Sequence, residues 1–224
     1  MQLKVLEKVR LFFPGVFSIM MAVYYQLSFN AKNVFELIDS DFEVSLSSIS
    51  FPSFLILMIG IFYYAYNIRN IPWKLVMKSV GNQINNALFS IAHRNPNKVK
   101  KETKETIRNT VYYHIIDHDN SLTEKSKIIK HNGAVLSCLI DTIIICILYL
   151  VIVVIVSIIK SQFIIGPFVL AIVFIVLSIP AVFIVLNKHK SLVNDQLVII
   201  KTYHSEECKN KIIEILGNGT SDKH

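Results

Sequence analysis

Four stretches of the chain are almost free of charge, and each is long enough to cross a lipid bilayer as a helix. They run from Leu11 to about Phe29, from Ile49 to Ile68, from Ala134 to Ile159 and from Phe163 to Leu186. A bilayer core needs about 20 mostly apolar residues in a helix, because each residue rises only about 1.5 Å. The sequence therefore predicts an all-α protein with four membrane spans and a layer of cytosolic helices.

Two alternatives to these spans can be weighed from the residues. The last two stretches are rich in Ile and Val, which favour strands in water, but buried strands run only about four to eight residues. In lipid the backbone N–H and C=O groups must form their hydrogen bonds within the segment, which favours helices. The first stretch follows Lys4, Lys8 and Arg10, as in a cleaved signal peptide. Its length and the lack of a small-residue cleavage site favour a retained span.

The basic residues predict the orientation of the spans. Every Lys and Arg except Lys32 and Lys160 falls on the side that holds the N-terminus, the region between spans two and three, and the tail. Because Lys and Arg concentrate on the cytosolic side, we expect a multi-pass protein of the inner (plasma) membrane with both ends cytosolic. The expected organisation is a cytosolic N-terminus (1–10), a transmembrane hairpin (11–68, spans 11–29 and 49–68, external loop 30–48), a cytosolic helical region (69–133), a second hairpin (134–186, spans 134–159 and 163–186) and a cytosolic helical tail (187–224).

The cytosolic segments show helical periodicity. Apolar residues recur at helical spacing after Pro72, at Leu75, Val76, Val80, Ile84, Leu88 and Ile91. Ser121 and Glu124 have the spacing of a capping box, which predicts a helix from Leu122 into the third span. Helices of this size bury too little surface to stand alone. Their apolar faces must pack on each other, on a second copy or on a partner, and we expect self-association.

Asp141 is the one charged residue inside a predicted span. An acid in a membrane is costly unless it faces a bundle interior, water or a partner, so it marks a functional site by default. Candidate partners are the hydroxyls of Ser18 and Tyr63 and, by bending inward, Arg10 and Arg69. The alternative is a carboxylate shallow enough to be solvated from the cytosol.

Two further groups of residues are candidate sites. His114, Asp117 and His118 share a helix face at i, i+3 and i+4, which would suit a divalent metal, although pairs of His four apart also occur by chance. Lys98, Lys101, Lys104 and Arg108 form a basic stripe for a partner or for lipid headgroups. No aromatic residues alternate with them, so we expect no direct nucleic-acid binding. No cofactor motif is present, and none is expected.

Three functional classes fit these features. The first is an oligomeric scaffold or sensor that recruits a cytosolic protein partner. The second is an oligomeric ion channel or membrane-depolarising effector. The third is a metal-dependent membrane enzyme, which is disfavoured because catalysis needs several convergent polar groups. We therefore expect a protein that is not an enzyme.

One family resemblance rests on architecture. The Ile, Lys and Asn bias resembles that of a horizontally acquired, AT-rich bacterial gene, and many such small membrane proteins belong to anti-phage systems. The layout of four spans, cytosolic ends and a helical middle region is similar to the membrane subunit of the Kiwa defence system. The resemblance implies a homo-oligomer, as a tetramer, that docks a cytosolic DNA-binding partner in antiviral defence. No signature motif carries it, so no functional residue is transferred.

Overall fold

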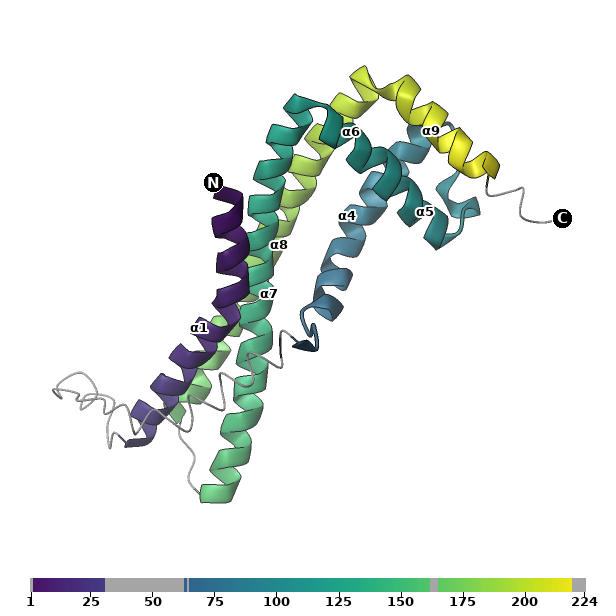
Figure 1. The fold of residues 1–224 in the computed structure, drawn as a ribbon. Coiled ribbons are helices and arrows are strands. Elements are labelled where there is room, and N and C mark those ends of the chain that lie inside the picture. Colours follow the sequence, from purple (N-terminus) through teal and green to yellow (C-terminus); the bar gives the residue numbers. More distant parts are fainter. Residues whose placement is uncertain (1, 31–62, 64, 162–164, 219–224) are drawn as a thin grey trace. The chain divides into compact units, whose positions relative to one another are not determined.

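The computed structural model describes residues 2–30, 63, 65–161 and 165–218. Within these residues the chain is helical apart from short turns, and it contains no strand (Figure 1). The prediction of an all-α protein is confirmed. The predicted external loop and most of the predicted span 49–68 lie outside the described residues.

The helices vary widely in length. In chain order they are α1 (Gln2–Asn30), α4 (Asn70–Ile91), the 3₁₀ turn η1 (Pro96–Lys98), α5 (Lys101–Ile107), the π-helical turn η2 (Arg108–Tyr112), α6 (Tyr113–His118), α7 (Asn120–Lys160), α8 (Ile165–Tyr203) and α9 (Ser205–Asn218). At 41 and 39 residues, α7 and α8 reach about 60 Å, roughly twice the thickness of a bilayer core.

Helices α7 and α8 are long and apolar enough to cross a membrane. In α1 the apolar stretch Phe13–Tyr25 is shorter. As predicted, α7 runs without interruption from its polar start into its apolar part. Its first turn is capped by Asp119 and not by Ser121: Asp119 Oδ1 accepts hydrogen bonds from the Ser121 amide at 2.7 Å and the Leu122 amide at 3.1 Å. A carboxylate satisfies the free amides of a first turn well.

The chain divides into two compact units, and the first comprises residues 1–73 and 134–184. Its core consists of Met21 from α1, Cys146, Tyr149 and Val153 from α7, and Ala171 from α8. Aromatic rings add directional contacts, because Tyr25 meets Tyr149 edge to face. This unit holds the apolar parts of all three helices.

The second unit comprises residues 74–133 and 185–224 and has a larger core. Buried side chains come from every helix in it: Val80, Ile84 and Leu88 of α4, Ile107 of α5, Val111 of η2, Ile115 of α6, Leu122 of α7, Val193, Leu197 and Ile200 of α8, and Cys208 and Ile212 of α9. The apolar faces thus pack on each other within one chain, and covering them does not require a second copy. Of the apolar residues predicted at helical spacing on α4, Leu75 alone is exposed, at 71%.

Candidate functional site

Asp141 lies on α7 in the first unit, and its side chain is completely buried. The Arg69 guanidinium donates two hydrogen bonds to the carboxylate, with Nε 2.7 Å from Oδ1 and Nη2 2.5 Å from Oδ2. Such a fork-to-fork pair is among the strongest polar contacts available to a carboxylate. The alternative that the Asp141 carboxylate is stabilised by solvent therefore does not hold.

A turn of the chain brings a second donor to the same carboxylate. The Tyr63 hydroxyl donates to Asp141 Oδ1 at 2.6 Å. Between Tyr63 and Arg69 the backbone turns at Asn67, whose φ of 50° lies in the left-handed region that Asn tolerates better than most residues. Tyr63 and Arg69 were two of the partners expected for Asp141. The side chain of Arg10, a third, lies outside the described residues.

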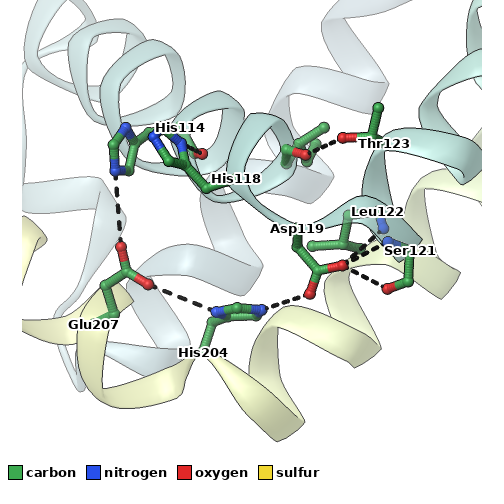
Figure 2. A network of polar contacts seen from close by, with 9 residues as sticks. His114, His118, Asp119, Ser121, Leu122, Thr123, His204 and Glu207 are labelled. Atoms are coloured by element: carbon green, nitrogen blue, oxygen red, sulfur yellow. Dashed lines mark hydrogen bonds and ion pairs between the residues drawn. The ribbon is translucent and has the colours of Figure 1, made fainter.

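The second unit contains a network of polar side chains centred on His204, where α8 ends and α9 begins (Figure 2). One ring nitrogen, Nε2, lies 2.9 Å from Asp119 Oδ2, and the other, Nδ1, lies 3.6 Å from Glu207 Oε2. Glu207 also accepts from Lys211 Nζ at 2.9 Å and lies 3.9 Å from His114 Nε2. The imidazole thereby connects the α6–α7 junction to α9.

The charges in this network are held by specific donors. Hydrogen bonds from the Ser121 hydroxyl, His204 and the Leu122 amide keep the pKa of Asp119 well below its usual range. The hydrogen bond from Lys211 likewise lowers the pKa of Glu207. His204 thus links Asp119 and Glu207 through its two ring nitrogens.

The structure brings together two of the three residues in the predicted metal site. The rings of His114 and His118 lie 4.0 Å apart, and His118 Nδ1 lies 2.8 Å from the His114 carbonyl oxygen (Figure 2). Asp117 is exposed. Among the described residues no three His, Cys, Asp or Glu side chains are grouped to hold a metal ion. The geometry therefore gives the metal site no support.

The predicted basic stripe divides into two parts. Lys98 and Lys101 are exposed, whereas Lys104 and Arg108 are half-buried. The Arg108 guanidinium lies over Gly81 of α4, where an added Cβ would come within 2.6 Å of Nη1. Arg108 therefore packs against a neighbouring helix, and Lys98 and Lys101 are the accessible charges of the stripe.

Sequence reasoning missed Asp119, His204 and Glu207. Asp119 carried a usable signal, because an acid just before a helical segment is a preferred cap. His204 and Glu207 carried none, because their role depends on α9 folding back to a residue 85 positions earlier. The chain matches no protein family model, no curated protein and no solved structure.

Proposed function

We propose that the chain is a four-span scaffold or sensor of the bacterial inner membrane, with both ends cytosolic, whose cytosolic helices recruit a soluble protein partner in antiviral defence. In this proposal residues 11–29 and 49–68 form the other two spans. The resemblance to the Kiwa membrane subunit supplies the setting, a homo-oligomeric state and a DNA-binding protein as the partner.

The observation that carries the proposal is the continuity of α7 and α8. Helix α7 has Tyr149 in the core of the first unit and Leu122 in the core of the second. Helix α8 has Ala171 in the core of the first unit and Leu197 in the core of the second. Both helices are unbroken between these residues. Each therefore joins an apolar segment to a segment with polar residues in one continuous element, as we expect of a membrane sensor.

Asp141 favours this function over an ion channel. A permeating cation is attracted by an acid with unbalanced negative charge. Asp141 is fully buried, and both of its oxygens accept from Arg69. This arrangement suits an ion pair that stabilises the fold, or a contact that forms in one of two states of a sensor. It does not suit a cation site.

Purification from the native host tests recruitment of a partner. The tagged full chain, extracted in mild detergent with its native neighbours expressed, should bring a stoichiometric soluble protein with it. Lys98→Glu/Lys101→Glu should lose that protein, because it reverses two exposed charges. Lys130→Glu, another exposed lysine of the same unit, is the matched control. Recovery of the chain alone under all conditions would contradict the scaffold proposal.

A reporter fusion tests the topology separately. A fusion after Ser40 should be active only outside the cytosol, whereas fusions after His118 and Gly217 should be active only inside. The reverse pattern, or recovery of the untagged chain in the soluble fraction, would overturn the four-span arrangement. Ion flux from liposomes that contain the chain alone would support the channel instead.

A further inference from the structure

The first half of α4 has a face that the core of the second unit leaves uncovered. Ile71 and Leu75 are each 71% exposed, although both are large aliphatic residues. Lys74 and Lys78 are also exposed. These four residues have the spacing i, i+3, i+4 and i+7, so they share one face of the helix. We call them the α4 face.

Helix α4 cannot rotate to bury the α4 face. Its opposite side buries Val80, Ile84 and Leu88 in the core, and rotating the helix to hide Leu75 would expose them. The α4 face is therefore committed to an environment outside the core. That environment must accept aliphatic carbons and ammonium groups side by side.

The charge of α4 indicates which environment the α4 face contacts. No Asp or Glu occurs between Arg69 and Lys101, so the whole of α4 carries only positive charge. A helix that combines lysines with large apolar residues and carries no acid is typical of helices that lie in a lipid interface. There the aliphatic side chains enter the acyl boundary, and the lysines extend toward headgroups.

We infer that the α4 face binds the cytosolic surface of the membrane, with Ile71 and Leu75 in the acyl boundary and Lys74 and Lys78 paired with the phosphates of anionic phospholipids. This inference rests on the proposed topology, in which α4 directly follows the span 49–68. It adds a lipid class and a lipid-binding surface that the basic stripe on α5 does not contain.

A second copy of the chain fits this face less well. In a symmetric contact each α4 face would meet its own counterpart. Lysines would then approach lysines, with no acid on either helix to pair with them. Like charges opposed in this way disfavour association, whereas anionic lipid supplies the missing phosphates.

The chain carries its own probe for this test. Trp73 is the one tryptophan in the sequence and lies within the α4 face segment. The full chain would be placed in phosphatidylcholine nanodiscs, with and without phosphatidylglycerol, and Trp73 quenching by brominated acyl chains would be measured. Phosphatidylglycerol retained by the purified chain would be measured by mass spectrometry.

The expected results separate the two parts of the face. Ile71→Asn/Leu75→Asn should reduce quenching of Trp73, because the helix withdraws from the acyl boundary. Lys74→Gln/Lys78→Gln should weaken phosphatidylglycerol retention by about fivefold per lysine, the value expected for one basic residue at an anionic surface. Lys201→Gln/Lys209→Gln, two exposed lysines on α8 and α9, should leave both readouts unchanged.

Two outcomes would overturn the inference. The first is equal quenching and equal lipid retention in all variants. The second is a Trp73 signal insensitive to bromine together with a lower oligomer mass for Ile71→Asn/Leu75→Asn, which would assign the face to a second copy. A carbonate wash distinguishes these failures from failure of the topology. A chain that stays in the membrane pellet but gives either outcome refutes the lipid site alone, whereas a chain released by the wash refutes both proposals.

Discussion

Arg69 and Asp141 lie 72 positions apart in the chain and meet in a two-point ion pair, with Arg69 Nε 2.7 Å from Asp141 Oδ1. Their surroundings are unequal. Asp141 is completely buried, whereas the Arg69 side chain is 17% exposed at the edge of the unit. Removing the partner of a buried charge lowers the free energy of unfolding more than removing the partner of a charge that can reach water. Substitutions of the two residues should therefore differ in their effect on stability.

Arg69→Met should be the more damaging change. It leaves the Asp141 carboxylate buried without the guanidinium, and breaking a buried pair in this way costs about 3–5 kcal/mol. Asp141→Leu should cost less, because Arg69 is 17% exposed and its guanidinium can extend toward solvent. The thermal midpoint in detergent and the amount of protein in the membrane fraction would measure both effects.

The double variant Arg69→Met/Asp141→Leu separates stability from function. Apolar residues of similar volume often replace a buried ion pair without loss of stability, so the thermal midpoint should recover most of what Arg69→Met loses. If the acid acts in the proposed antiviral sensing, this stable variant should lose the protection against phage that this proposal expects of the wild-type chain. Full protection would make the pair purely structural, and a midpoint as low as that of Arg69→Met would contradict the energetic argument.

Tyr112→Phe should destabilise the second unit by about 1–3 kcal/mol, the cost of leaving a buried polar group without its partner. The Tyr112 hydroxyl donates to Gln196 Oε1 at 2.6 Å, and Gln196 Nε2 donates to the Leu122 carbonyl. Thermal unfolding monitored by circular dichroism would report the loss. Tyr113→Phe is the matched control, because Tyr113 is 47% exposed, and a similar loss there would contradict the assignment.

The stability of the second unit should fall as the pH drops below about 6.5, because of His189. Burial lowers the pKa of His189 below its ordinary value of 6.5. In that window the unfolded chain binds a proton that the folded chain does not, so acid favours unfolding, and the full stability is present only above it.

His189→Leu should flatten this part of the pH profile. Because His189 Nδ1 is buried without a hydrogen-bond partner, the substitution should not lower the thermal midpoint at neutral pH. Thermal midpoints measured from neutral to mildly acidic pH would test both statements. An unchanged acid-induced loss in His189→Leu would assign it to another group.

His204→Ala should loosen α9, with Cys208 as the reporter. Cys208 is fully buried, and burial raises the pKa of its thiol to about 11, so it should react slowly with maleimide. Without His204 the contacts to Asp119 and Glu207 are lost, and labelling of Cys208 should become several-fold faster. Peptide mass spectrometry would follow Cys208 separately from the other cysteines.

His118→Ala is the control for this experiment. Its ring lies on His114 and against the His114 carbonyl, within α6. Labelling of Cys208 should therefore keep the wild-type rate. Equal acceleration in both variants would show that α6 as a whole, and not the His204 contacts, holds α9.

The sequence by itself determined the features that depend on local pattern. The long apolar stretch from Ala134, with Asp141 as its one charge, predicted the apolar part of α7, and the spacing of Val80, Ile84 and Leu88 predicted the buried face of α4. Hydropathy and helical periodicity are properties of neighbouring residues, so they can be read before any tertiary contact is known. The acid at position 141 was also identifiable, because an apolar surrounding makes a charge conspicuous.

Only the tertiary structure decided which side chains meet. The spacing that marked Val80 as core marked Leu75 equally, yet Leu75 is 71% exposed and is not part of the core that the described helices form. Asp119 replaced Ser121 as the cap of α7, and it accepts from His204 only because α9 folds back. Contacts between residues 70 to 85 positions apart depend on how the helices pack. That packing depends on the apolar faces of all the helices together, so no local segment determines it.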